Sequence, residues 1–162
     1  MIIRFVFKSS IANTRLGDVS LLYRNSLPCS VRHVQGFDQA LVVELNFKRK
    51  KIFFTVLYRS PSNPNGSPEF DNFLQNFEEL YTKIKSENPY AIFFAGDFNG
   101  HSQLWCPSGN TTPEGTRIEE LTSFLGLTQL IAEPTNFEPN KTPSCIDLIF
   151  TNQPILVMES GK

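Results

Sequence analysis

YAIFFAGDFNGH, residues 90–101, joins an apolar segment directly to a polar one. Residues 90–95 are apolar at nearly every position, which is typical of a central strand with both faces covered. Directly after this segment come Asp97, Asn99 and His101. Because catalytic groups meet solvent at the ends of central strands, we expect a functional site where this strand ends.

Outward from this segment, the chain alternates between predicted strands and predicted helices. Apolar runs bounded by turn residues predict strands at 2–7, 19–23, 40–47, 52–58, 91–95 and 145–150. Apolar residues three or four positions apart predict a helix from Phe70 to Ile84, with Ser67 as its N-cap. A second helix is expected from about Glu114 to Leu125. This pattern predicts a layered α/β fold, and the length of 162 residues fits one domain, residues 1–162.

Composition narrows the classes of function. Lys and Arg number 15 against 16 Asp and Glu, so no overall positive field draws the chain to polyanions. The basic run 48–51 is expected to be a solvated hairpin tip. We expect no signal peptide and no membrane span, and therefore an intracellular protein, nuclear or cytoplasmic and not secreted.

The cysteines and histidines do not predict a metal site. Three cysteines lie far apart without a paired motif, so reduced thiols are expected rather than disulfides. A zinc centre is not expected, because the possible ligands have no recognised spacing; they are Cys29, His33, Cys106 and Cys145. We assign no function to His33, whereas His101 is a candidate for lining the site.

Asp97 and Asn99 form the first candidate pair. A carboxylate can orient or deprotonate a water molecule, and a neighbouring amide can donate a hydrogen bond to a phosphate oxygen. The alternative is an Asx-turn that only closes the strand.

Asp147 and the pair Tyr58 and Arg59 are further candidates. Asp147 interrupts an apolar strand, and a buried carboxylate needs a partner, so it either orients a histidine, shares a metal site, or faces water on an edge strand. Tyr58 and Arg59 end a strand with hydrogen-bond donors, and Arg can bind phosphate oxygens bidentately. The alternative for these two residues is an ordinary surface position.

Three motifs in order resemble one family. They are LYRSP at 57–61, GDFNGH at 96–101, and PTNF at 134–137 followed by SCIDLI at 144–149. In order and spacing they resemble the endonuclease/exonuclease/phosphatase family, and more narrowly the endonuclease domain of non-LTR retrotransposons of the jockey, CR1 or RTE kind. The region from Asn13 to Pro28 resembles the early part of those domains.

The resemblance implies a four-layer sandwich, with two mainly antiparallel β-sheets packed face to face and helices outside. It also implies hydrolysis of DNA phosphodiesters with Mg²⁺. Carried over by position, Asp97 activates or orients the attacking water, Asn99 binds the scissile phosphate, and Tyr58 donates to a phosphate oxygen. Thr135 matches a phosphate-contacting threonine, and Asp147 matches the acid that orients a terminal histidine. The adjoining candidates for substrate binding are Arg59, His101 and Ser144.

The sequence also departs from the family pattern. The metal-binding glutamate of the family and its accompanying asparagine have no counterpart, so we expect no complete metal site and weak or absent Mg²⁺ binding. No histidine follows Asp147. We therefore expect a domain truncated at both ends, inactive or nearly so alone, and prone to self-association.

Two alternatives stay open. One is a phosphatase or repair nuclease of the same fold, and the other is a non-catalytic nucleic-acid-binding or interaction remnant. DNA is the expected partner, and neither a membrane nor an obligate protein partner is inferred.

Overall fold

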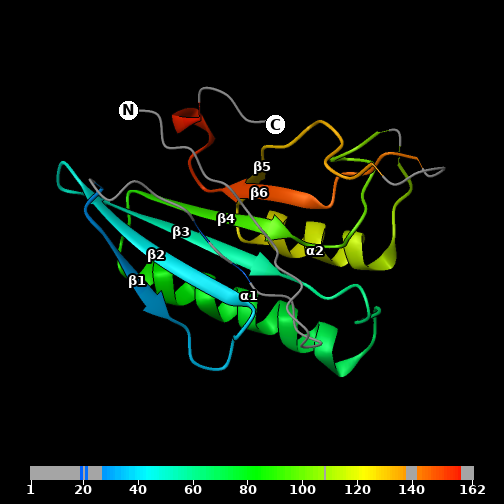
Figure 1. The fold of residues 1–162 in the computed structure, drawn as a ribbon, viewed down its shortest axis with the longest axis horizontal. Coiled ribbons are helices and arrows are strands. Elements are labelled where there is room, and N and C mark those ends of the chain that lie inside the picture. Colours follow the sequence, from blue (N-terminus) through cyan, green and yellow to red (C-terminus); the bar gives the residue numbers. More distant parts are fainter. Residues whose placement is uncertain (1–18, 20, 22–26, 108, 138–141, 158–162) are drawn as a thin grey trace.

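The described residues form one six-stranded sheet with two helices. The computed structural model describes residues 19, 21, 27–107, 109–137 and 142–157. The elements in chain order are β1 (Cys29–His33), β2 (Ala40–Phe47), β3 (Lys50–Tyr58), α1 (Pro68–Ser86), β4 (Ala91–Asp97), α2 (Pro113–Phe124), β5 (Thr128–Gln129), β6 (Asp147–Thr151) and the 3-10 helix η1 (Pro154–Leu156). The strand order is β1-β2-β3-β4-β6-β5, and all neighbours are antiparallel except β3 and β4 (Figure 1). The predicted mixed fold with mainly antiparallel pairing is confirmed.

A second sheet is not formed by the residues that the structure describes. The strand expected at 2–7 lies outside them, as does the strand expected at 19–23 apart from Val19 and Leu21. The four-layer arrangement of the sandwich therefore stays a prediction.

Helix α1 begins where the sequence predicts it. The Ser67 hydroxyl accepts a hydrogen bond from the Phe70 backbone N–H, and Pro68 occupies the first turn, where its missing N–H is not needed. The helix connects β3 to β4, and this long crossover is what lets these two strands pair in parallel.

Helix α2 begins one residue before the predicted start. Its N-cap is Thr112, whose hydroxyl accepts from the Gly115 backbone N–H, and Pro113 opens the first turn. Gly126 follows the helix with φ of 68°, the left-handed conformation that commonly ends a helix.

Both helices cover the same face of the sheet, where the aromatic core lies (Figure 1). The Phe77 ring packs edge-on against Phe94 at 4.6 Å between centroids, and Phe98 packs against Phe150 at 5.2 Å. The opposite face is apolar as well. There the Phe54 and Phe93 rings stack at 4.8 Å. The central strands are thus covered by apolar side chains on both faces.

Two short strands were not predicted, and the start of β6 differs from the predicted one. Strand β1 was not predicted, because CSVRH lacks a continuous apolar run and its exposed positions outnumber its partly buried ones. Strand β5 is only two residues long, too short for a pattern. Strand β6 begins at Asp147 instead of at 145, and the Cys145 thiol before it donates to the Glu133 carbonyl at 2.9 Å. In the part of the chain that the structure describes, no helix is long and apolar enough to cross a membrane.

Candidate active site

Three predicted site residues lie in one row across neighbouring strands. In the register of the sheet, Tyr58 on β3 pairs with Asp97 on β4, and Asp97 pairs with Asp147 on β6. Neighbouring strands lie about 4.8 Å apart. Side chains alternate between faces, and Phe94 and Leu148 belong to the core beneath the helices. The three side chains of the row therefore share the face opposite α1 and α2.

The direction of the strands brings the row to one end of the sheet. Because β3 and β4 are parallel, their carboxyl ends meet at the same edge, where Tyr58 and Asp97 are the last residues (Figure 1). Strand β6 runs the other way, so its first residue, Asp147, lies at this edge. A strand end and a strand start thus supply the two carboxylates.

A tight turn places Asn99 beside Asp97. The Asn99 backbone N–H donates to Asp97 Oδ1 at 3.0 Å, and Asn99 has a φ of 47°. The Asn99 Nδ2 atom donates to the Arg59 carbonyl at 2.7 Å. The Asx-turn and the proximity of carboxylate and amide are therefore both present. The Asn99 side chain also forms a hydrogen bond with the Asp97 carboxylate, which favours the ionised form of Asp97.

Both carboxyl groups have raised pKa values, and the charge of Asp147 contributes to the increase at Asp97. Burial, followed by the charge of Asp147, raises the pKa of Asp97 to about 6. Partial burial also raises the pKa of Asp147, and a hydrogen bond with the Thr135 side chain opposes this increase. Two carboxyl groups with raised pKa values at one strand edge are typical of a functional site.

Thr135 is held against the start of β6. Its hydroxyl oxygen accepts hydrogen bonds from the backbone N–H groups of Ile146 and Asp147, at 3.2 and 3.0 Å. Ser144 is linked to this segment through its backbone, because its carbonyl accepts from the Thr135 and Asn136 N–H groups. The structure therefore brings Thr135 to Asp147, and it brings Ser144 near them by main-chain contacts.

Arg59 differs from the sequence expectation of a substrate contact. Its side chain is turned into the protein, and the residue is only 3% exposed. The guanidinium donates to the carbonyls of Phe98, Asn99, Ser60 and Asn63. Because the guanidinium N–H groups already donate to these backbone carbonyls, Arg59 is not placed to bind a phosphate bidentately, in contrast to the expectation from the sequence.

His101 is half-buried in the loop after β4 and is anchored through its backbone. Its N–H donates to the Thr112 hydroxyl at 3.3 Å, and its carbonyl accepts from the Thr112 N–H at 2.9 Å. Among the described residues, no hydrogen bond joins its imidazole to Asp97 or Asp147. The structure places this histidine in a loop next to the site without showing a role for it.

Sequence reasoning missed Gly115, which allows the loop and α2 to approach closely. A Cβ atom at this position would lie 1.8 Å from the His101 carbonyl oxygen. Glycine in a helix is unfavourable by about 1 kcal/mol relative to alanine, so its presence in the first turn of α2 was the available signal.

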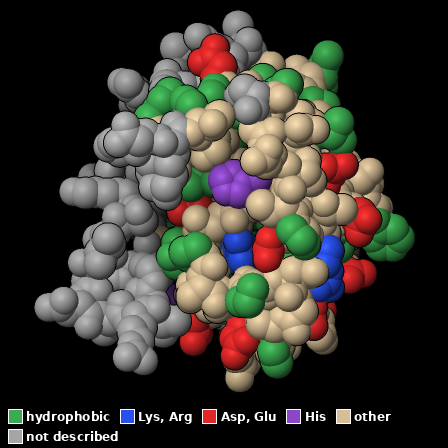
Figure 2. All heavy atoms as spheres, turned by 90° about the vertical axis from the view of Figure 1, so that its right-hand side faces the viewer, with side chains coloured by type: hydrophobic (Ala, Val, Ile, Leu, Met, Phe, Trp, Pro, Cys, Tyr) green, Lys and Arg blue, Asp and Glu red, His purple; other side chains and the backbone are tan. Residues whose placement is uncertain are grey.

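Charges of both signs surround this end of the molecule. Figure 2 views the side to which β3 and β4 point, and its acidic and basic side chains are interspersed around a histidine. The visible part of this face carries no continuous basic patch, in agreement with the nearly neutral composition.

The donor set suits a hard cation only in part. Asp97 and Asp147 offer carboxylate oxygens, which Mg²⁺ prefers, and this ion commonly uses one or two carboxylates with water and phosphate as further ligands. Among the described residues, no group of three or more His, Cys, Asp or Glu side chains could hold a metal ion.

Comparison with known structures identifies the fold. The endonuclease domain of TRAS1, a telomere-specific non-LTR retrotransposon, superposes with a TM-score of 0.68 at 19% identity, over 95% of this chain and 68% of that domain. A mutant of beta toxin from Staphylococcus aureus with bound magnesium ions gives a TM-score of 0.46 at 15% identity, over 70% of this chain and 42% of the toxin. The 3′ phosphatase NExo from Neisseria, bound to a product DNA hairpin, gives 0.45 at 19% identity, over 68% of this chain and 51% of that enzyme.

A comparison with curated protein sequences finds no significant match. Residues 52–161, which include most of β3, all of β4 and β6, and the whole row of site residues, match the family described as endonuclease-reverse transcriptase. Because this match covers more than half of the chain and agrees with the fold, the chain belongs to the endonuclease-reverse transcriptase family.

Proposed function

We propose that this chain carries the phosphate-binding and water-activating part of a DNA endonuclease that hydrolyses phosphodiester bonds with Mg²⁺. The observation that carries the proposal is the row of Tyr58, Asp97 and Asp147 at one strand edge, with the pKa of Asp97 raised to about 6. We also propose that residues 1–162 act as one domain.

Asp97 is the residue that orients the attacking water and accepts its proton. At neutral pH its carboxylate is mostly ionised, and a pKa near the working pH suits both accepting and releasing a proton. Hydrogen bonds from the Asn99 backbone N–H and from the Asn99 side chain hold this carboxylate in a fixed orientation.

Tyr58 and Asn99 supply neutral hydrogen-bond donors to the phosphate. Tyr58 is on the strand next to Asp97, and the Asn99 amide, which hydrogen-bonds to Asp97 and to the Arg59 carbonyl, lies in the adjoining turn. Donors held in place before the reaction stabilise the charge that develops on the phosphate oxygens without reorganising.

Asp147 is the residue that would hold Mg²⁺, and the Asp97 carboxylate stays free to accept the proton of the water. The bound ion supplies charge neutralisation at the phosphate. Thr135 keeps Asp147 at the strand edge through its hydrogen bonds, and we propose that it contacts the phosphate from there.

Arg59 acts as a positioning residue in this proposal. Its guanidinium donates to the Asn99 carbonyl, and its own carbonyl accepts from the Asn99 side chain. Arg59 therefore holds both the backbone and the side chain of Asn99 in place. Arg59 thus contributes by positioning Asn99 and not by contacting the phosphate.

We further propose that turnover by this chain is low. A single carboxylate binds Mg²⁺ more weakly than a larger set, and no described histidine hydrogen-bonds to Asp147 to complete an acid–base pair. The low turnover rate is tested separately from the kind of reaction that the chain catalyses.

The experiment is nicking of supercoiled plasmid by the full chain with Mg²⁺, compared with hydrolysis of a small phosphate monoester. We expect slow nicking that requires Mg²⁺ and falls at least 100-fold in Asp97→Asn, since a positioned base contributes about 10²-fold or more. Glu78→Gln is the matched control, because this acid is exposed on α1.

Each result decides one part of the proposal. Nicking that survives in Asp97→Asn contradicts the role of Asp97, and preference for the monoester indicates a phosphatase. DNA binding without cleavage at any Mg²⁺ concentration indicates a non-catalytic module. Fast nicking by the unmodified chain contradicts only the proposal of low turnover.

A further inference from the structure

The turn between β2 and β3 holds two basic residues in a backbone conformation that favours other residue types. Lys48 has a φ of 47° and Arg49 a φ of 65°, and the flanking Phe47 and Lys50 pair with each other. A two-residue hairpin turn with both φ values positive favours Asn followed by Gly. Long side chains adopt this conformation only at a cost in free energy. Lys48 and Arg49 therefore occupy turn positions whose backbone conformation favours neither residue type.

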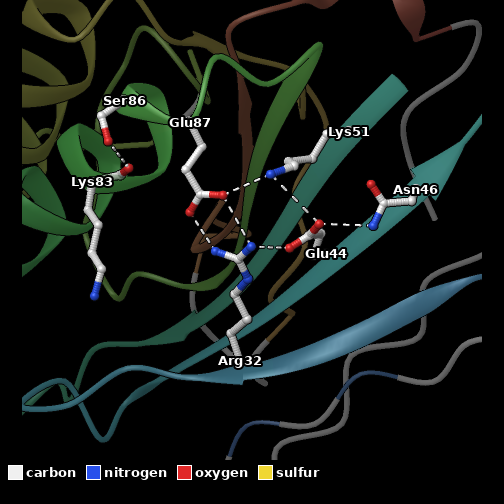
Figure 3. A network of polar contacts seen from close by, with 7 residues as sticks. All are labelled: Arg32, Glu44, Asn46, Lys51, Lys83, Ser86 and Glu87. Carbon is white, nitrogen blue, oxygen red and sulfur yellow. Dashed lines mark hydrogen bonds and ion pairs between the residues drawn. The ribbon is translucent and has the colours of Figure 1, made fainter. Parts of the chain in front are cut away.

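The cations beside this turn are already balanced by carboxylates. Arg32 bonds to Glu44 and Glu87, and Lys51 Nζ lies 2.9 Å from Glu87 Oε2 (Figure 3). Two positive and two negative charges therefore compensate each other at the C-terminal end of α1.

The basic tip, which we define as Lys48, Arg49 and Lys50, lies outside this network. All three side chains are exposed, and none forms an ion pair with any residue that the structure describes. The basic tip therefore carries an uncompensated positive charge.

Aromatic rings support two of these cations. Lys50 Nζ lies 3.6 Å from the centre of the Tyr90 ring, and Lys48 Nζ lies 5.4 Å from the centre of the Phe47 ring. Cation–π contacts hold an ammonium group in place without neutralising its charge. The tip is thus a partly ordered cationic surface.

We propose that the basic tip binds the phosphate backbone of a nucleic acid, at a contact separate from the row of Tyr58, Asp97 and Asp147. Strand β3 runs from Lys50 to Tyr58, and at about 3.3 Å per residue this places the tip about 26 Å from the row. Exposed point charges at a turn suit phosphates without regard to base sequence. The choice of nucleic acid over other polyanions rests on the proposed function.

The test is binding of a fluorescent DNA duplex by the full chain and by the double variant Lys48→Asn with Arg49→Gly. This variant gives the turn its favoured residues, so we expect thermal stability equal to or above that of the unmodified chain. We expect about a tenfold increase in Kd at low salt, and a slope of log Kd against log salt that is smaller by about two. Reduced binding by a chain that is equally stable separates a ligand contact from a structural role.

A matched control removes the same charge from the neighbouring helix. Lys83→Gln with Lys85→Gln changes two exposed side chains in the last turn of α1. An equal loss of binding in this control overturns the proposal, because it would indicate a response to net charge alone. Unchanged binding in the hairpin variant also overturns it.

Two competitors identify the ligand. Single-stranded RNA that competes better than the duplex assigns the tip to RNA phosphates, within the proposal. Polyglutamate that competes as well as nucleic acid contradicts the proposal and indicates an acidic protein partner. Nicking at saturating DNA is expected to stay unchanged in the hairpin variant, so failure of this proposal and failure of the proposed function give different results.

Discussion

At the scale of single residues, two carboxyl groups on neighbouring strands dominate the chemistry. Asp97 and Asp147 pair in the register of β4 and β6, and neither has a basic side chain hydrogen-bonded to it among the described residues. Burial raises the pKa of both groups, and for Asp97 the charge of Asp147 adds to this increase. The pH dependence of activity and the stability of the fold both follow from this pair.

We expect activity to fall as the pH is lowered through about 6, because Asp97 then becomes protonated and no longer accepts a proton. Asp147→Asn removes the repulsion that helps to raise this pKa. A ¹³C NMR titration of the carboxyl groups should therefore give a lower Asp97 pKa in that variant. An Asp97 pKa that does not respond to Asp147→Asn would mean that the two groups do not interact.

Asp97→Asn should stabilise the protein at pH 7.5 while it removes activity. Since folding raises the pKa of Asp97 from 3.8 to about 6, its contribution to stability is full below pH 3.8 and is lost as the pH rises through 6. After a discount for its partial exposure, the loss at pH 7.5 is about 1–2 kcal/mol. Urea unfolding should show this gain at pH 7.5 and a much smaller one at pH 4, and destabilisation at pH 7.5 would refute it.

At the scale of elements, the site depends on how the segments after β3 and β4 are joined. Arg59, directly after β3, bonds to carbonyls both in its own loop and in the turn after β4. The turn contains Asn99 in the left-handed region, which the surrounding bonds must maintain.

Arg59→Lys is expected to lower the free energy of unfolding by about 2–4 kcal/mol, because lysine cannot reach all of these carbonyls and leaves buried acceptors unpaired. Arg117→Lys is the control. Arg117 pairs with Asp71 on an exposed surface, so its change should cost less than about 0.5 kcal/mol. Denaturant unfolding measures the change in the free energy of unfolding for each variant. Equal changes in the two variants would show that the buried network around Arg59 contributes nothing specific.

Sequence patterns predicted the elements that pack against the core, and they failed where tertiary contacts decide. Helix α1 was predictable because its apolar residues lie three or four positions apart. Strands β2, β3 and β4 were predictable because each is a short apolar run bounded by turn residues. The row of Tyr58, Asp97 and Asp147 followed from motifs that end or begin such strands. The burial of Arg59 was not predictable, since its partners are backbone carbonyls that carry no sequence signal.

At the scale of the whole molecule, the end opposite the site is held by a charged network. Arg32 on β1, Glu44 on β2 and Lys51 on β3 meet Glu87 at the end of α1 (Figure 3). This network links three strands to the helix that crosses beneath them. The two ends of the sheet thus differ, with repelling carboxylates at one and paired charges at the other.

Glu87→Gln should reduce stability by about 0.5–1 kcal/mol at pH 6, the size expected for a partly exposed ion pair. Hydrogen bonds from Arg32 and then Lys51 lower the pKa of Glu87 from 4.5 to about 2. Its stabilising contribution is therefore present above pH 4.5 and disappears as the pH falls through 2.

Unfolding measured between pH 2 and 6 checks this. The difference between variant and unmodified chain should vanish near the acidic limit and shrink in high salt. Glu78→Gln, on the exposed face of α1, should show no such trend. A difference that stays constant with pH would exclude the ion pairs as its cause.

The pairing of β4 with β6 also affects the order in which a nascent chain acquires its parts. Asp97 is synthesised as part of the local β3-α1-β4 unit. Asp147 is synthesised later, after α2 and the long segment that follows α2. Closure of such a distant contact is slow compared with local folding. During synthesis the first carboxylate therefore spends an interval without its repelling neighbour, and the pair forms only after β6 has been made.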